Sequence, residues 1–343
     1  MPRPPTHVNL AGFFCIAALL AVPPAMAEPV QIFLAHAQPQ DPALDPVAAV
    51  AEEFRRLLPE KTQGRLNVEI FPDGQLGGNR DMTNLASKGI IQSALVTVGG
   101  VTPLYPPLMA TQLPFTFSTL PQARAALAGD FARDMAADMA ARTKLALLGF
   151  ADPGGFHVLT NFDREISSPD DMWGLRLRAI PGFAPLEAMI TAVSARPIQI
   201  SSRDEVAMMA TGAVDGQMSP PLVIMARNFD TVQHHATLLD ALYSPYVWVF
   251  NSAALKQMSA ADRDGVAQAA SAALSHGYQV VDHLNQSAIG RSGLAKRMKL
   301  RTLSASEREA FRQIMQPPVE QAIRDALGPD ANWLDKFKDT ALR

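Results

Sequence analysis

A short alternation of apolar and basic residues before a Pro-Gly pair is the most informative pattern in the chain. Residues 175–179 read Leu-Arg-Leu-Arg-Ala, with the period of two that is typical of a strand with one apolar face. Pro181-Gly182 ends the strand, so it should carry Arg178 to a sheet edge, where ligands of α/β folds usually bind. A guanidinium can hold a carboxylate there through two parallel hydrogen bonds. The alternative is that Arg178 and Arg176 form only the solvated face of a strand.

The first half of the chain alternates between strand and helix patterns. Apolar runs predict strands at residues 30–35, 66–71, 93–98 and 144–150, and helical periodicity predicts helices at about 46–58, 79–87 and 129–143. This spacing is typical of βαβ units, so we expect a largely parallel sheet with helices on both faces.

A glycine-rich break separates this half from the second. We place a lobe boundary at Asp152-Pro153-Gly154-Gly155, which gives one lobe of residues 28–153 plus 244–284 and another of residues 154–243 plus 285–343. Further elements are predicted as strands at 158–160, 175–179 and 246–250, helices at 183–193 and up to Gly212, and capping boxes at 202–205 and 304–307. Residues 262–292 predict one helix of about 45 Å, long enough to run along both lobes. Two lobes joined by several segments suggest a cleft that closes like a hinge.

Composition and charge narrow the class of protein. The 343 residues allow about two domains. A hydrophobic content of 48% with 18% charged residues indicates a well-packed globular protein. A formal charge of −3 without a basic stripe argues against a nucleic-acid partner.

The first 27 residues have the features of a secretory signal peptide. An apolar run at 10–22 is followed by Ala25-Met26-Ala27, a small-x-small cleavage site. The single cysteine, Cys15, lies inside this segment, so cleavage after Ala27 would leave no thiol for a disulfide or a metal. We expect export to a bacterial periplasm. An uncleaved anchor is the alternative, against which Pro23-Pro24 argues by breaking the helix.

Four short segments resemble one known family. Residues 62–77 fit the pattern TxGxxxxxxxPxxQLG, residues 113–115 read LPF, residues 174–178 read GLRLR, and residues 211–217 read TGAVDGQ. In this order they resemble the DctP-type substrate-binding proteins of tripartite ATP-independent periplasmic (TRAP) transporters. The resemblance covers nearly all of the chain after residue 27.

The resemblance implies a fold and a function. The expected fold is α/β, a two-lobed periplasmic binding protein fold in which each lobe is a mixed sheet flanked by helices and a long brace helix spans both lobes. The expected protein is a monomeric receptor without a cofactor or metal, which binds a small organic acid and delivers it to TRAP-type permease subunits. In the family the arginine of the GLKxR segment pairs with the ligand carboxylate, and Arg178 is its counterpart.

Departures from the family pattern bear on the ligand. His157 stands where a second arginine is common, and Met218-Ser219-Pro220 replaces Glu-Asn-Pro. One permanent cation with small uncharged neighbours favours a monocarboxylate with an apolar or hydroxylated body, and a dicarboxylate is the alternative. At its reference pKa of about 6.5, His157 could gain a proton when a dicarboxylate binds. The candidate ligand-binding residues are Arg178, His157, Ser219, Thr97, His36, Asn79, Phe183 and Tyr243.

Other functions find less support in the sequence. His234-His235 could suggest a metal, but adjacent side chains point apart and no further ligand is near in sequence. Gly77-Gly78 and Gly99-Gly100 lack the GxGxxG spacing of nucleotide-binding loops, and no GxSxG or HExxH motif is present. A receptor that signals to a membrane sensor remains an alternative, as does a periplasmic enzyme acting on an organic acid.

Overall fold

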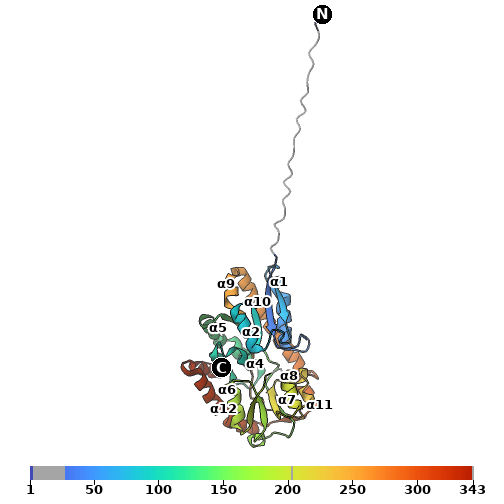
Figure 1. Cartoon of the computed structure of the whole chain (residues 1–343), viewed down its shortest axis with the longest axis vertical. Helices are drawn as coiled ribbons and strands as arrows, with labels where there is room; N and C mark the ends of the chain where they lie inside the picture. The colour runs from blue at the N-terminus through green and yellow to red at the C-terminus, as the bar shows by residue number, and fades with distance from the viewer. Residues whose placement is uncertain (3–27, 202–203, 342–343) are drawn as a thin grey trace.

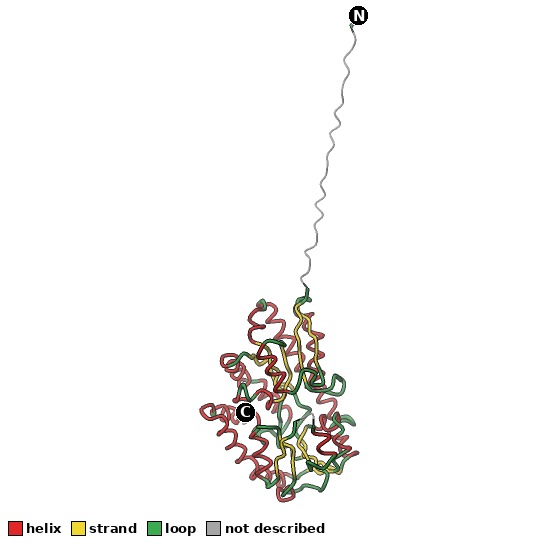
Figure 2. The backbone as a smooth tube through the Cα atoms, viewed as in Figure 1, coloured by secondary structure: helices red, strands yellow, loops and turns green. Residues whose placement is uncertain are grey.

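Two β-sheets lie one above the other along the long axis of the molecule, and each is flanked by helices (Figure 2). The computed structural model describes residues 1–2, 28–201 and 204–341. The predicted signal peptide therefore lies almost entirely outside the described residues. Helices α1, α2, α9 and the first part of α10 surround the upper sheet, and α6, α7, α8, α11 and α12 surround the lower one (Figure 1).

The first sheet has the strand order β2-β1-β3-β10-β4. Its strands are β1 (Val30–His36), β2 (Leu66–Phe71), β3 (Ser93–Thr97), β4 (Leu145–Ala151) and β10 (Tyr246–Asn251). Strand β1 runs parallel to β2 and β3, whereas β10 runs antiparallel to β3 and β4. The sheet is therefore mixed rather than largely parallel. The alternation in the first half of the chain did not reveal this, because β10 enters the sheet from about a hundred residues further on.

The second sheet has the order β11-β9-β5-β8-β6-β7. Its strands are β5 (Val158–Asn161), β6 (Arg176–Ala179), β7 (Arg196–Gln199), β8 (Gly216–Ser219), β9 (His235–Leu238) and β11 (Lys299–Thr302). Strand β6 runs parallel to β7 and β8, while β5 runs antiparallel to β8 and β9. The sequence pattern missed β7, β8, β9 and β11, which are only four residues long. Strands β5 and β6 have the same length and were predicted, β6 because apolar and basic residues alternate there.

Helices make up most of the remaining structure. They are α1 (Pro46–Lys61), α2 (Asn79–Lys88), α3 (Val98–Val101), α4 (Leu120–Ala128), α5 (Asp130–Arg142), α6 (Ala184–Ala192), α7 (Glu205–Ala210), α8 (Pro221–Ala226), α9 (Ser252–Gln257), α10 (Ala260–Gln286), α11 (Arg291–Arg297), α12 (Ala305–Leu327) and α13 (Asn332–Ala341), with 3-10 turns η1 (Pro106–Gln112), η2 (Pro169–Met172), η3 (Phe229–Thr231) and η4 (Gly328–Asp330). Among the described residues, no helix has both the length and the apolar character needed to cross a bilayer.

Helix α10 is the predicted brace. It packs on α1 and β4 beside the first sheet and on α8 and α11 beside the second, so it spans both lobes. Its 27 residues extend about 40 Å and end at Gln286, where Ser287 caps the helix, rather than at residue 292. The predicted capping box at the start of α12 is confirmed: Ser304 N donates to Glu307 Oε2, and Glu307 N donates to Ser304 Oγ at 3.2 Å.

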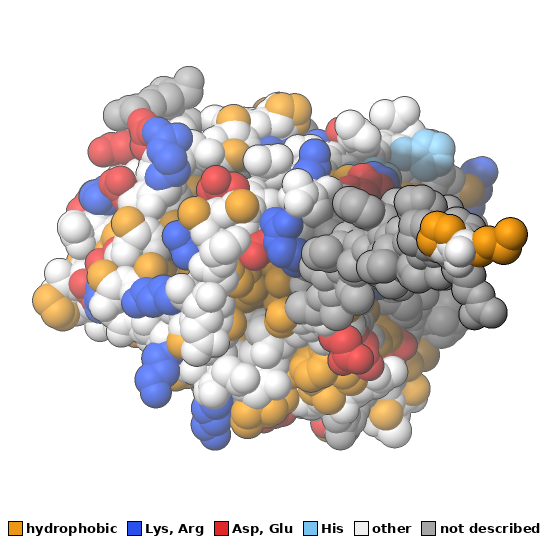
Figure 3. All heavy atoms as spheres, turned by 90° about the horizontal axis from the view of Figure 1, so that it is seen from above, with side chains coloured by type: hydrophobic (Ala, Val, Ile, Leu, Met, Phe, Trp, Pro, Cys, Tyr) orange, Lys and Arg blue, Asp and Glu red, His pale blue; other side chains and the backbone are white. Residues whose placement is uncertain are grey.

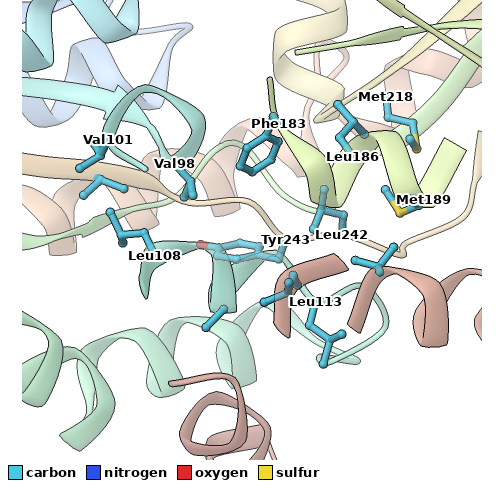
Figure 4. Close-up of a cluster of buried hydrophobic side chains, with 14 of the residues drawn as sticks. Val98, Val101, Leu108, Leu113, Phe183, Leu186, Met189, Met218, Leu242 and Tyr243 are labelled. Atoms are coloured by element: carbon cyan, nitrogen blue, oxygen red, sulfur yellow. The ribbon is translucent and has the colours of Figure 1, made fainter. Parts of the chain in front are cut away.

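A buried apolar cluster joins the two lobes. It includes Val98, Leu113, Phe183, Leu242 and Tyr243, which come from both halves of the molecule and pack together in Figure 4. Helix α13 packs on η1, α4 and α5 beside the first sheet, whereas α12 packs mainly on α6. The C-terminal helices therefore reach both halves. On the face seen in Figure 3, basic and acidic side chains are interspersed.

Candidate ligand-binding cleft

A cavity of about 320 Å³ lies between the two lobes. Small-molecule sites usually begin at about this size. The lining includes Gln38, Asn79, Thr97 and Gly99 from the first half and His157, Arg178, Phe183, Glu205, Ser219 and Arg227 from the second. Six of the eight predicted residues therefore line one cavity, namely Arg178, His157, Ser219, Thr97, Asn79 and Phe183.

Arg178 is a largely buried cation inside this cavity. Its side chain is only 13% exposed, and its Nε donates to the carbonyl oxygen of Ile200 at 3.2 Å. Burial lowers the pKa of Arg178, an effect that the charge of Glu205 opposes. Arg176, two residues earlier, pairs with Asp215 instead, with 2.6 Å between Arg176 Nη2 and Asp215 Oδ1. The solvated-face interpretation therefore fits Arg176 but not Arg178.

Glu205 faces Arg178, and sequence reasoning missed it as a site residue. Its Oε1 lies 2.9 Å from Arg178 Nη2, and its Oε2 lies 3.5 Å from Arg227 Nη1. A capping box starting at residue 202 would make Glu205 the third helical residue, but α7 begins at Glu205 itself. Residue 202 lies outside the described residues. The predicted capping box therefore lies partly outside the described residues, and two arginines distant in sequence meet the Glu205 carboxylate.

Arg227 is a second cation in the cavity, so the expectation of a single one is corrected. It follows the last residue of α8, and no motif marked it. Its Nη2 also donates to Gln38 Oε1 at 3.4 Å, a contact between the two halves of the molecule. Arg80 and Asp81, both exposed at the start of α2, line the same cavity.

His157 is held in its neutral form. Burial lowers its pKa to about 4, and the nearby charge of Arg178 acts in the same direction, while a hydrogen bond to the backbone of Met218 opposes both. Its backbone N–H donates to the Leu242 carbonyl oxygen at 2.8 Å. The reference pKa of about 6.5 therefore does not apply to His157. Ser219 lies beside it, because Val158 and Ser219 are register partners of β5 and β8.

The first lobe contributes uncharged groups. Asn79 Oδ1 accepts a hydrogen bond from Thr97 N at 3.2 Å, which ties the start of α2 to the end of β3. The lobes touch at Gly99, where an added Cβ would lie 3.6 Å from the ring of Phe183. An alanine at position 99 would therefore make ordinary van der Waals contact with that ring.

Two predicted residues lie outside the cavity lining. His36 is fully buried at the end of β1, with its Nε2 3.1 Å from Gln40 Oε1. Tyr243 is 4% exposed and belongs to the apolar cluster between the lobes (Figure 4). Burial raises the pKa of Tyr243 well above its usual value, and Asp152 acts in the same direction. From their sequence positions, we expected both side chains to lie near a ligand. In the folded protein both side chains are buried away from the cavity.

A small side pocket of about 40 Å³ adjoins the main cavity. It shares His157, Arg178 and Phe183 with the cavity, and apolar side chains complete most of its wall: Ile180, Pro185, Leu186, Met189, Met218 and Leu242. This volume is close to the space that one water-sized group occupies. A methyl group would fit there.

His235 begins β9, and His234 precedes it. The rings of His234 and Phe162 lie 4.6 Å apart between centroids and are tilted by 39°. Among the described residues, no three His, Cys, Asp or Glu side chains are grouped so that they could hold a metal ion.

The chain resembles known proteins over most of its length. The family described as "Bacterial extracellular solute-binding protein, family 7" matches residues 37–325. The C4-dicarboxylate-binding periplasmic protein DctP of Rhodobacter capsulatus is 25% identical over 322 residues, which cover 94% of each chain. The sugar acid binding protein DctPAm of Advenella mimigardefordensis, solved with galactonate, is 24% identical with a TM-score of 0.81, over 91% of this chain and 99% of that one. A TRAP periplasmic solute binding protein of Shewanella oneidensis, solved with succinate, is 22% identical with a TM-score of 0.82 over the same shares.

Proposed function

The chain belongs to family 7 of the bacterial extracellular solute-binding proteins, and we propose that it captures a small organic acid for a TRAP-type membrane permease. The observation that carries this proposal is a largely buried arginine, Arg178, in a cavity between two lobes. A buried cation of this kind favours a ligand that brings an anionic group. We place the protein in the periplasm, as a monomer released by cleavage after Ala27.

The ligand class follows from the groups around Arg178. A neutral His157 and the hydroxyl of Ser219 can exchange hydrogen bonds with a hydroxyl or carbonyl group of the ligand. The apolar side pocket next to Arg178 has room for a methyl group. We therefore propose a monocarboxylate with a hydroxylated or short apolar body.

A dicarboxylate is the second candidate, and Arg227 is the observation that favours it. A second guanidinium lines the cavity, and a second carboxylate could pair with it. The relative in Rhodobacter capsulatus is named for C4-dicarboxylates, and the neighbour from Shewanella oneidensis holds succinate. A monocarboxylate would pair with Arg178 alone, whereas a dicarboxylate would pair with both Arg178 and Arg227.

The proposed function is tested by titration calorimetry with a panel of mono- and dicarboxylic acids. Arg178→Ala should weaken binding by about 3–5 kcal/mol, because it leaves the ligand carboxylate desolvated and unpaired. Arg178→Lys keeps the charge but cannot form the bidentate hydrogen bonds of a guanidinium. Its affinity should therefore lie between those of the wild type and Arg178→Ala.

Arg176→Ala is the matched control, since this arginine lies on the same strand but pairs with Asp215 outside the cavity. It should bind acids like the wild type. Circular dichroism checks the fold of each variant. If no acid binds the wild type, or if Arg178→Ala binds as tightly as the wild type, the proposed function is wrong.

A further inference from the structure

One carboxylate of the protein already lies between the two arginines of the cleft. Glu205 Oε1 is 2.9 Å from Arg178 Nη2, and Glu205 Oε2 is 3.5 Å from Arg227 Nη1. The Glu205 side chain is only 6% exposed, so water does little to screen these contacts. Each oxygen thus faces a different guanidinium, as the two oxygens of a bound acid could.

The charges of the inner cavity leave room for one further anion. Among the described lining residues apart from the exposed start of α2, the ionised groups are Arg178, Arg227 and Glu205, with Arg227 22% exposed, and His157 is neutral, so their sum is +1. Arg80 and Asp81 carry opposite charges at the exposed start of α2 and cancel. One ligand carboxylate would balance the charges of these lining side chains. A second would be buried without its own cation, which is costly.

Glu205 distinguishes between ligand groups by its chemistry. An ionised carboxylate accepts hydrogen bonds but cannot donate them. It therefore attracts a hydroxyl group that can donate and repels a second carboxylate that approaches Arg227. Burial raises the pKa of Glu205 above its usual value, and the charges of Arg178 and Arg227 oppose this rise without reversing it. The two guanidinium groups at 2.9 Å and 3.5 Å are the partners that an ionised carboxylate takes.

We propose that Glu205 is the residue that restricts this cleft to acids with one carboxylate and that selects hydroxylated ones among them. The proposal rests on the proposed function and narrows it. Arg178 holds the ligand carboxylate, a hydroxyl group of the ligand donates to Glu205, and Arg227 is occupied by Glu205 rather than by a second carboxylate. The ligand class is a hydroxylated monocarboxylic acid.

The test compares four acids with four carbons each: butyrate, 2-hydroxybutyrate, succinate and malate. They differ only by a hydroxyl group and by a second carboxylate. The wild type should bind 2-hydroxybutyrate more tightly than the other three. Glu205→Gln keeps the size of the side chain and removes its charge, so succinate and malate should gain at least tenfold in affinity relative to 2-hydroxybutyrate. The preference for 2-hydroxybutyrate over butyrate should shrink in the same variant.

Asp204→Asn is the matched control. Asp204 precedes Glu205, is exposed, and loses the same charge in this variant, so the affinity ratios should stay at their wild-type values. An equal gain for all four acids in Glu205→Gln would mean that Glu205 competes with the ligand for Arg178, and this would overturn the proposal. Unchanged ratios would overturn it as well.

A second variant covers the case in which Glu205→Gln does not fold. In Arg227→Gln, Glu205 has only Arg178 to neutralise, so the net charge of the inner cavity falls to zero. Affinity for 2-hydroxybutyrate should then fall at least tenfold, and unchanged affinity would contradict the proposed charge balance. Wild-type protein that binds no acid at all counts against the proposed function itself, whereas intact binding with unchanged ratios counts against Glu205 alone.

Discussion

The imidazole of His157 is held neutral by its surroundings well below neutral pH. Burial and the charge of Arg178 lower its pKa to about 4, although a hydrogen bond to the backbone of Met218 opposes them. In the unfolded chain the same group should titrate near about 6.5. Binding of a monocarboxylate should therefore not depend on His157 protonation between pH 6 and 8, and a ligand cannot easily recruit a proton there.

This difference in pKa predicts how stability depends on pH. Between pH 6.5 and 4 the unfolded state binds a proton at His157 that the folded state does not, so stability is present above pH 6.5 and lost as pH falls toward 4. The loss is at most about 3 kcal/mol. Urea unfolding of the wild type and of His157→Gln, from pH 7.5 to 4, measures it as a difference. Burial raises the pKa of Asp45 to about 6, so its contribution to stability changes with pH in the opposite direction. This contribution is the same in both proteins and cancels when their stabilities are subtracted. Parallel curves for the two proteins would contradict the prediction.

The segment after β4 connects the lobes through a tightly bonded turn. Asp152 Oδ1 accepts hydrogen bonds from Gly154 N at 2.9 Å and Gly155 N at 3.0 Å, and its Oδ2 accepts one from Arg124 Nε at 2.8 Å. Both glycines have a positive φ, +105° and +114°, which other residues rarely adopt. The predicted lobe boundary therefore lies at a turn that needs glycine, which is consistent with a hinge.

Gly154→Ala should destabilise the protein by about 1–3 kcal/mol, because the new side chain is strained by its φ. Its Cβ would also lie 3.1 Å from Leu222 Cβ, so Leu222 would have to shift. Gly174→Ala is the control: its φ is +75°, but an added Cβ would meet nothing within 4 Å. Urea denaturation should show a larger loss for Gly154→Ala than for Gly174→Ala. Equal losses would mean that only the backbone conformation matters at residue 154.

At the scale of the whole molecule, the cleft is bounded by two lobes that meet through both a polar and an apolar contact. Arg227 Nη2 donates to Gln38 Oε1 at 3.4 Å, and Phe183 packs near Gly99. Helix α10 packs along both lobes, so it restricts how the two lobes can move relative to one another. A ligand bound to Arg178 and to first-lobe groups such as Thr97 would add contacts that exist only in the closed form.

Ligand binding should therefore close the cleft and reduce the radius of gyration. Small-angle scattering with and without a saturating acid from the binding panel measures this change. Arg178→Ala at the same acid concentration should keep the larger radius, because it loses the contact that favours closure. A wild-type radius that does not change with bound acid would argue against a hinge.

The sequence by itself determined the elements with long, regular patterns and the position of Arg178. Strands such as β1, β2 and β10, the brace helix α10 and the capping box at Ser304 depend mainly on neighbouring residues, so a local pattern identifies them. The same holds for Arg178, whose strand alternates within five residues. Resemblance over four ordered segments identified the family, which the comparisons confirm.

Only the tertiary structure decided which other groups meet in the cleft. Glu205 lies in α7 and Arg227 directly follows α8, two or more elements after β6, and their contacts with Arg178 depend on how β6, α7 and α8 pack. The neutrality of His157 and the burial of His36 depend in the same way on surrounding atoms rather than on neighbouring residues. Burial and charge pairing are set by distances in space, and these arise only when strands distant in sequence join one sheet.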